Sequence, residues 1–335
     1  MSQTVFISGA SGYIAQHITA KLLAKGYKVI GSVRSAKKGD ELKSLFKNEN
    51  LSYVVVPDIQ ADGAFDEALK QHPEISVFLH TASPFVFQVE DVEKELLLPA
   101  VTGTKVALTS VLNHGPQIKR VVVTSSYAAM FANEDIPDVV SDETTWTELT
   151  WEQAKQNGLV GYLASKAFAE KAAWDFVEKE KPNFKLSTVN PTYVFGPQLF
   201  DEYATGPVST SVELIKAVLK LQPTDEVPSV QGPFIDVRDV ADAHLVAFES
   251  DAAIGQRILL QDGRFSNSKV VEIIKANFPE FKDKIPAPKT THEEEIKSHC
   301  KLDSSKSDKI LGIKFISIEQ SIKDTVAQFI KVKAV

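Results

Sequence analysis

The sequence places Val5-Phe6-Ile7-Ser8-Gly9-Ala10-Ser11-Gly12-Tyr13-Ile14-Ala15 close to its N-terminus. The apolar residues that open this stretch predict a buried strand, and the pattern from Tyr13 onward predicts a helix. Glycine at positions 9 and 12 permits a tight turn and lets backbone N–H groups approach a pyrophosphate at the positive end of the helix. Ala15 is small where that helix has to pack against the strand. The stretch therefore predicts a strand–turn–helix unit that binds a dinucleotide.

The same strand–helix rhythm continues to about residue 190, which predicts an α/β fold with a doubly wound parallel sheet of the Rossmann type. Several strands, such as Val121–Val123, are apolar at almost every position, as expected when both faces of the sheet are covered. Within the fourth helix, Pro99 predicts a bend or an interruption. The expected strands are Thr4–Ser8, Lys28–Val33, Ser52–Val56, Ser76–His80, Arg120–Thr124 and Lys185–Val189, and the expected helices are Tyr13–Lys25, Gly39–Lys47, Phe65–Lys70, Val89–Asn113 and Val160–Glu180.

The rhythm changes after Pro191, where closely spaced prolines predict loops and short elements. We expect residues 1–190 to form the dinucleotide-binding domain and residues 191–335 to form mainly a smaller, discontinuous substrate-binding lobe. In this second part, Phe234–Asp239 is expected to lead the chain back to the sheet and to start a helix. The segment near 234–249 is therefore expected to return to the first domain.

Composition narrows the classes of function. The chain has 335 residues and a formal net charge of −7, and this acidic balance argues against binding to the phosphate backbone of nucleic acids. Cys300 is the only cysteine, which excludes a disulfide framework and zinc sites built on several thiolates. His292 and His299 lie near Cys300 without metal-ligand spacing, so we expect no metal site. The sequence shows neither a secretory signal nor a run of about 18 apolar residues, so we expect a cytoplasmic protein with no membrane partner.

The residues that follow the second expected strand indicate which dinucleotide binds. An NAD site carries Asp or Glu about 20 residues beyond the glycines, where the carboxylate bonds the ribose 2′-hydroxyl. Here that position is Ser32, and Arg34 and Lys38 follow it. No carboxylate is present to repel a 2′-phosphate, and two cations are available to bind it. We therefore expect NADP(H) as the cofactor.

A second signal is Tyr162-Leu163-Ala164-Ser165-Lys166, at the start of the last expected helix of the first domain. The four-residue spacing puts Tyr162 and Lys166 on the same face of that helix. An ammonium close to a phenol favours the phenolate, so Lys166 is expected to lower the pKa of Tyr162 from about 10 toward neutrality. Such a tyrosine can give a proton to a carbonyl oxygen as a hydride arrives, or take one from an alcohol in the reverse reaction.

A third signal is the pair Ser125 and Ser126 at the carboxyl end of a buried strand, where ligands of open α/β sheets bind. One of the two hydroxyls is expected to donate a hydrogen bond to the carbonyl oxygen of a substrate. The alternative role for either serine is to cap or stabilise the turn.

Further motifs are His80-Thr81-Ala82-Ser83-Pro84-Phe85, Thr124-Ser125-Ser126-Tyr127-Ala128-Ala129, Phe168-Ala169-Glu170-Lys171-Ala172-Ala173-Trp174, Tyr193-Val194-Phe195-Gly196-Pro197-Gln198 and Ile235-Asp236-Val237-Arg238-Asp239-Val240. With these motifs, the sequence resembles the extended short-chain dehydrogenase/reductases, in the branch that includes dihydroflavonol and cinnamoyl-CoA reductases. The resemblance is greatest to fungal NADPH-dependent carbonyl reductases that act on aldehydes, and it runs along almost the whole chain. It implies NADPH-dependent reduction of aldehydes and ketones to alcohols.

The resemblance also implies roles for individual residues. Ser126, Tyr162 and Lys166 would be the catalytic residues, and Lys166 would also hold the nicotinamide ribose. Cofactor binding would involve Gly9, Ala10, Ser11, Gly12, Tyr13 and Ile14 at the pyrophosphate, Arg34 and Lys38 at the 2′-phosphate, Asp58 and Ile59 at the adenine, and Thr81, Ala82, Ser83, Val194 and Ser211 elsewhere. The walls of an apolar substrate pocket would be Phe85, Tyr127, Phe131, Val160 and Tyr193.

Two other functions remain open at this point. A sugar-nucleotide epimerase or dehydratase on the same scaffold needs cations for a second diphosphate, and between residues 200 and 235 only Lys216 and Lys220 are available. A regulatory protein that binds NADP without turnover would not need the Tyr162–Lys166 pair. The expected partner is a small-molecule carbonyl substrate, and the chain is expected to be a monomer or a homodimer.

Overall fold

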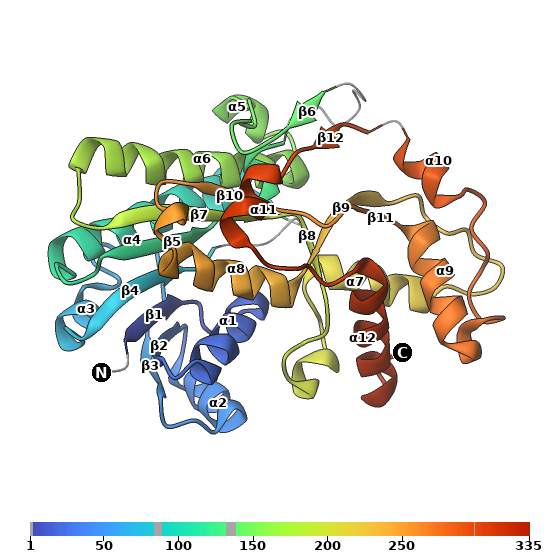
Figure 1. Ribbon diagram of the computed structural model, residues 1–335, viewed down its shortest axis with the longest axis horizontal. Helices are drawn as coiled ribbons and strands as arrows, with labels where there is room; N and C mark the ends of the chain where they lie inside the picture. Colours follow the sequence, from blue (N-terminus) through green and yellow to red (C-terminus); the bar gives the residue numbers. More distant parts are fainter. Residues whose placement is uncertain (1–2, 84–88, 132–138, 298) are drawn as a thin grey trace.

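The computed structural model describes residues 3–83, 89–131, 139–297 and 299–335. Figure 1 shows a layered α/β body with helices on both faces of a central sheet and a smaller lobe beside it. The sheet has seven parallel strands in the order β10-β7-β5-β4-β1-β2-β3, which is the doubly wound Rossmann arrangement. Its strands are β1 (Thr4–Ser8), β2 (Lys28–Val33), β3 (Leu51–Val55), β4 (Ile75–His80), β5 (Arg120–Thr124), β7 (Lys185–Pro191) and β10 (Arg257–Leu260).

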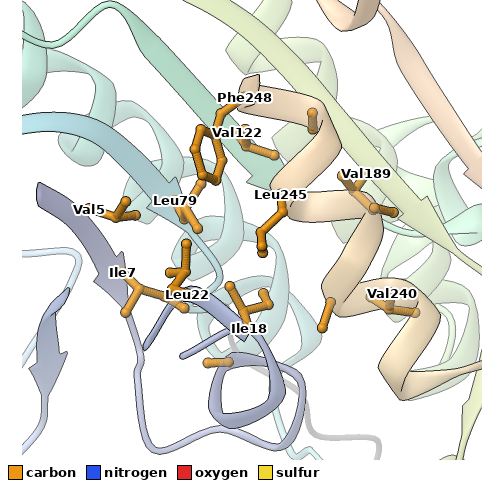
Figure 2. Close-up of a cluster of buried hydrophobic side chains, with 14 of the residues drawn as sticks. Val5, Ile7, Ile18, Leu22, Leu79, Val122, Val189, Val240, Leu245 and Phe248 are labelled. Carbon is orange, nitrogen blue, oxygen red and sulfur yellow. The ribbon is translucent and has the colours of Figure 1, made fainter. Parts of the chain in front are cut away.

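Two apolar layers hold the helices against this sheet. Alternate residues of each strand point to opposite faces, so Val5 and Ile7 pack on one side while Phe6 packs on the other. The first side, drawn in Figure 2, buries Leu22 and Leu245 from two helices against the strands. This face is covered by α1 (Tyr13–Ala24), α2 (Ala36–Phe46) and α8 (Val237–Glu249), and the opposite face by α3 (Asp66–Gln71), α4 (Leu98–His114) and α6 (Gly158–Glu180).

The helix that contains Pro99 is interrupted, as the sequence analysis predicted. A π-helical turn, Glu93–Leu97, leads directly into α4, and Pro99 lies in the first turn of α4, where a missing N–H is tolerated. The combined segment Glu93–His114 is long and apolar enough to cross a membrane, but most of it is buried inside the protein. It is covered by α6, by α3 and by the strands of the sheet.

The smaller lobe has its own sheet and its own core. Its strands β8 (Tyr193–Phe195), β9 (Gln231–Asp236) and β11 (Arg264–Ser266) lie in the order β11-β9-β8. Phe195, Phe234 and Phe265 are fully buried beneath helices of this lobe. The helices are α7 (Thr210–Leu219), α9 (Asn267–Asn277) and α12 (Ile318–Lys331). Shorter elements are β6 (Val140–Ser141), β12 (Lys301–Leu302), α5 (Trp151–Ala154), α10 (His292–Ile296) and α11 (Ser305–Leu311), and 3-10 turns at Tyr127–Ala129, Asp201–Ala204, Asp251–Ala253 and Pro279–Phe281.

All six strands and the helices expected in the first 190 residues are present, with ends that differ by a few residues from the expected ones. The chain returns to the main sheet through α8, which packs against it. The residues before α8, which were expected to lead back to the main sheet, instead form β9 of the smaller sheet. The sequence analysis did not predict β10, because Arg257–Leu260 is short and begins with a charged residue. β10 pairs with β7 as an edge strand of the main sheet, so residues beyond 190 supply one of its strands as well as a helix.

Candidate active site

A cavity of about 450 Å³ opens at the carboxyl ends of the central strands, between the main sheet and the smaller lobe. Parallel strands present their carboxyl ends at one edge of the sheet, so loops from distant parts of the chain meet there. The lining residues come from the β1–α1 turn, the ends of β4 and β5, the first turns of α6, and the segments that lead to β8 and α7: Gly9, Ser11, Gly12, Tyr13, Ile14, Thr81, Ser83, Ser125, Ser126, Tyr162, Lys166, Thr192, Val194, Gln198, Tyr203 and Ser211 among others.

The β1–α1 turn has the form that a pyrophosphate needs. Gly9 has φ +68°, and a Cβ at this position would lie 3.1 Å from Ala82, so a larger residue would be both strained and crowded. Gly12 caps α1 without a side-chain hydrogen bond, and the first turn of α1 holds no acidic residue. The first backbone N–H groups of α1 are therefore available to an anion at the positive end of the helix. These residues fit a dinucleotide.

The segment after β4 is fixed beside this turn. Ser8 Oγ accepts hydrogen bonds from the backbone N–H groups of Thr81 and Ala82, each at 3.0 Å. Thr81 Oγ1 in turn donates to the Ser8 carbonyl. Thr81 and Ser83, two of the predicted cofactor residues, consequently line the cavity together with Gly9.

The two serines after β5 have different hydrogen-bond partners. Ser125 Oγ donates to the buried carboxylate of Glu170, so its proton points away from the cavity. Ser126 Oγ accepts from the Ala128 N–H at 3.1 Å, and its hydroxyl forms a hydrogen bond with the phenol of Tyr162. Of the two serines that the sequence analysis left open, Ser126 has the geometry for donation to a ligand beside Tyr162.

Tyr162 and Lys166 lie one turn apart on α6 and both line the cavity. Lys166 Nζ donates to Ser83 Oγ at 2.9 Å and lies 5.8 Å from the centre of the Tyr162 ring. Burial lowers the pKa of Lys166 to about 8. Burial also raises the pKa of Tyr162 to about 12, helped by the nearby Tyr193 and opposed by the Ser126 hydrogen bond.

The expected effect of Lys166 on Tyr162 is therefore wrong for this arrangement. The sequence analysis predicted a phenol pKa lowered toward neutrality, whereas burial of the phenol raises the Tyr162 pKa. Burial is the largest cause, and the Lys166 ammonium, which donates to Ser83 Oγ at 2.9 Å, does not offset it. Spacing along a helix predicted that the two side chains share a face, but it did not predict the desolvation of both groups.

Of the residues predicted for the adenosine end of the cofactor, Arg34 and Lys38 follow β2, and Asp58 and Ile59 follow β3, its neighbour in the sheet. Arg34 is exposed directly after β2. Lys38 Nζ pairs with Glu41 Oε2 at 2.9 Å and lies 5.8 Å from the ring centre of Tyr203, which lines the cavity. Within the described part of the chain, the predicted cofactor residues that fall outside the cavity lining are Ala10, Arg34, Lys38, Asp58, Ile59 and Ala82.

The predicted substrate-wall residues that the structure describes, Tyr127, Phe131, Val160 and Tyr193, are not among the residues that line the active-site cavity. Tyr193 lies close enough to Tyr162 to raise its pKa, and Tyr127 is buried with its hydroxyl 3.8 Å from Cys300 Sγ. Phe131 and Val160 line a second cavity of about 720 Å³ with residues 144–149 and 163. Phe85 lies outside the described residues.

Several lining residues were not predicted from the sequence. Gln198 and Tyr203 reach the cavity from the loop between β8 and α7, and residues 207–210 border it as well. Gln198 is held there by Gln328 of α12, whose side chain bonds the Gln198 backbone N–H and C=O at 2.7 and 2.9 Å. In the sequence, only the motif Tyr193–Gln198 pointed to this loop. It did not show which positions contact the cavity, because those contacts depend on the packing of α12.

The histidines near Cys300 are occupied by protein contacts. The ring Nδ1 of His292 lies 2.9 Å from Ser266 Oγ, and that of His299 lies 3.2 Å from Gln231 Nε2. Among the residues that the structure describes, no three His, Cys, Asp or Glu side chains gather in a way that could hold a metal ion.

The Rossmann sheet and the anion-binding turn at its first βα junction define the chain as a dinucleotide-binding protein. Residues 5–260 match the NAD dependent epimerase/dehydratase family. The chain is 52% identical to a putative NADPH-dependent methylglyoxal reductase of Candida albicans over 98% of this chain and 99% of the relative. It is 44% identical to the NADPH-dependent methylglyoxal reductase of Saccharomyces cerevisiae, with 98% of each chain covered.

A solved structure supports the same assignment. The yeast methylglyoxal/isovaleraldehyde reductase complexed with NADPH matches with a TM-score of 0.96 and 42% identity, over 99% of this chain and 100% of the other. The chain belongs to the NAD dependent epimerase/dehydratase family, and the predicted resemblance to fungal reductases of the extended short-chain type is confirmed.

Proposed function

We propose that this protein reduces the carbonyl group of small aldehydes and ketones to an alcohol, with NADPH as the cofactor. The observation that carries the proposal is the Ser126–Tyr162 hydrogen bond in the same cavity as the Gly9–Gly12 turn. Relatives of 52% and 44% identity are named as NADPH-dependent methylglyoxal reductases, which supports the same reaction class.

Each residue of the proposed site has a distinct task. NADPH, when bound, supplies the hydride that reduces the carbonyl carbon. Tyr162 gives its proton to the carbonyl oxygen, and a pKa of about 12 keeps the phenol protonated at neutral pH, which is the form a proton donor needs. Ser126 donates a hydrogen bond to the same oxygen and so stabilises the charge that develops there. Lys166 positions Ser83 and, in this proposal, the ribose of the cofactor.

The proposed substrates are modest apolar aldehydes and ketones. Tyr127, Phe131, Val160 and Tyr193 are proposed to contact the substrate, although none of them lines the cavity that holds Tyr162. Aromatic and aliphatic walls favour apolar groups over phosphorylated sugars. We also propose that the reaction takes place in the cytoplasm.

A sugar-nucleotide substrate fits the same cavity less well. Lys216 donates to the Gly206 carbonyl at 2.9 Å, and Lys220 pairs with Glu213 at 3.5 Å. The two cations of this region are thus already engaged by the protein, which leaves a second diphosphate without a ready partner. A regulatory protein without turnover would have no use for the Ser126–Tyr162 arrangement.

The first test is loss of NADPH absorbance after addition of a simple aldehyde such as methylglyoxal or 3-methylbutanal. We expect steady oxidation of NADPH that depends on both protein and aldehyde. Binding of NADPH, seen as quenching of protein fluorescence, without any turnover across aldehydes, diketones and aryl ketones would contradict the proposal and favour the regulatory alternative.

Replacement of Arg34 by Ala is expected to raise the KM for NADPH about tenfold or more and to leave the KM for NADH nearly unchanged. The reason is that a guanidinium–phosphate pair contributes about 1.5–3 kcal/mol, and only NADPH carries the 2′-phosphate. Lys37→Ala is the matched control, since Lys37 is an exposed cation three residues further along, in the first turn of α2, and has no assigned role. Equal effects on the two cofactors would remove Arg34 from the proposed site.

A further inference from the structure

The motif Phe168–Trp174 continues the helix of the catalytic pair but has no task in the proposed reaction. Tyr162, Lys166, Glu170 and Trp174 follow one another at four-residue intervals, so they form a single row along α6. The first two face the cavity, whereas Glu170 is 1% exposed and accepts a hydrogen bond from Trp174 Nε1 at 3.2 Å. The row therefore leads from residues that line the cavity to residues that lie between α6 and the sheet.

Glu170 is the centre of a buried polar cluster. Its Oε2 accepts from Ser125 Oγ and from Asn190 Nδ2, the latter at 2.6 Å. Its Oε1 accepts from Arg257 Nε at 2.5 Å and from Thr188 Oγ1 at 3.2 Å. These partners come from the end of β5, from β7 and from β10, strands that lie side by side beneath α6 in Figure 1. Such a cluster fixes the position of every group in it, because a broken hydrogen bond would leave a buried polar atom unpaired.

Asn190 connects this cluster to the catalytic serine. It is fully buried, and its side-chain amide donates one hydrogen bond to Glu170 and the other to the Ser126 carbonyl at 3.1 Å. Its Oδ1 faces Thr188 Oγ1 at 2.8 Å, so the orientation of the amide is fixed from both sides. The Ser126 backbone is thereby tied to a buried carboxylate, and the hydroxyl of the same residue forms the hydrogen bond with Tyr162.

We infer that Asn190, oriented by Glu170, is a positioning residue for the reaction: it holds the Ser126 backbone so that the hydroxyl reaches the oxygen that Tyr162 protonates. The inference rests on the proposed function. A hydrogen-bond donor that points at a developing oxyanion raises the rate by about 10²–10³-fold. A displacement of the donor by about 1 Å removes much of this rate enhancement. Asn190 itself is not among the residues that line the cavity, so we assign it no contact with substrate or cofactor.

The test is a double-mutant cycle between Asn190 and Ser126. We expect Asn190→Ala to lower kcat about tenfold or more and to leave the dissociation constant of NADPH within about twofold. In a protein that already carries Ser126→Ala, the same change at Asn190 is expected to have no further effect on kcat, because the hydroxyl that it positions is gone. A merely structural role would lower kcat by the same factor in both backgrounds, and that outcome would overturn the inference.

Ser187→Ala is the matched control. It removes a buried hydroxyl from the same strand, but this hydroxyl donates to the Ala253 carbonyl at 2.6 Å, outside the Glu170 cluster, so kcat should change less than about twofold. Equal losses of kcat for Ser187→Ala and Asn190→Ala would also overturn the inference. A wild-type protein without aldehyde-dependent NADPH oxidation would instead refute the proposed function itself, so the two failures are distinguishable.

Asn190→Asp gives a second route if the alanine variant does not fold. It keeps the side-chain volume but replaces the two N–H donors of the amide with at most one O–H. The adjacent Glu170 carboxylate accepts the hydrogen bond from that O–H. The Ser126 carbonyl then has no donor, so the same loss of kcat is expected with NADPH binding kept. An Asn190→Asp protein with wild-type kcat would contradict the inference.

Discussion

Tyr162→Phe is expected to remove nearly all aldehyde reduction, with kcat lower by about 10²–10⁴-fold, while NADPH binds almost as tightly as before. The phenol oxygen is the only atom removed, and it is the proposed source of the proton for the carbonyl oxygen. The high pKa of Tyr162, about 12, means that the wild-type phenol is in its donating form at the pH of the assay. Loss of the hydroxyl thus removes the donor without a change in the charge of the site.

The measurement is the rate of NADPH oxidation with a saturating aldehyde, combined with the dissociation constant of NADPH from fluorescence. Tyr203→Phe is the matched control, because Tyr203 contributes another phenol to the lining of the same cavity and has no assigned role. It should keep most of the activity. A Tyr162→Phe protein that retains more than about a tenth of the wild-type kcat would refute the assigned proton donor.

The parts of the site that the sequence predicted are those encoded by neighbours in the chain. The Gly9–Gly12 turn follows directly from a strand that runs into a helix, and Tyr162 and Lys166 share a face because they are four residues apart. Likewise, Arg120–Thr124 is apolar enough to be recognised as a buried strand without knowledge of its partners. Local pattern was sufficient for each of these.

Features that depend on residues far apart in the chain were not predicted. The choice of Ser126 over Ser125 depends on Glu170, 45 residues further along, which accepts the Ser125 proton. The direction of the Tyr162 pKa shift depends on burial by the surrounding protein rather than on the neighbouring lysine. The edge strand β10 was missed, and with it Arg257, whose partners lie between 87 and 128 residues away in the sequence.

Arg257→Met is expected to lower the free energy of unfolding by about 3–5 kcal/mol, because it leaves the Glu170 carboxylate buried without its cation. The wild-type pair is desolvated on both sides, with side-chain exposures of 9% for Arg257 and 0% for Glu170. The guanidinium also donates to the Thr145 carbonyl at 2.6 Å and to the Ala129 carbonyl at 3.3 Å, so the change removes several buried hydrogen bonds together. The midpoint of urea unfolding, at unchanged slope, measures the loss.

Arg120→Met is the matched control, since Arg120 is the first residue of β5 as Arg257 is the first of β10, but it pairs with Asp251, whose side chain is 91% exposed. An exposed partner remains hydrated when its cation is removed, so this variant should lose about 1 kcal/mol or less. The double variant Glu170→Gln/Arg257→Met should be more stable than Arg257→Met alone, because it removes the unpaired buried charge. Equal losses for the two arginine variants, or no recovery in the double variant, would show that the buried ion pair does not dominate the stability of this face of the sheet.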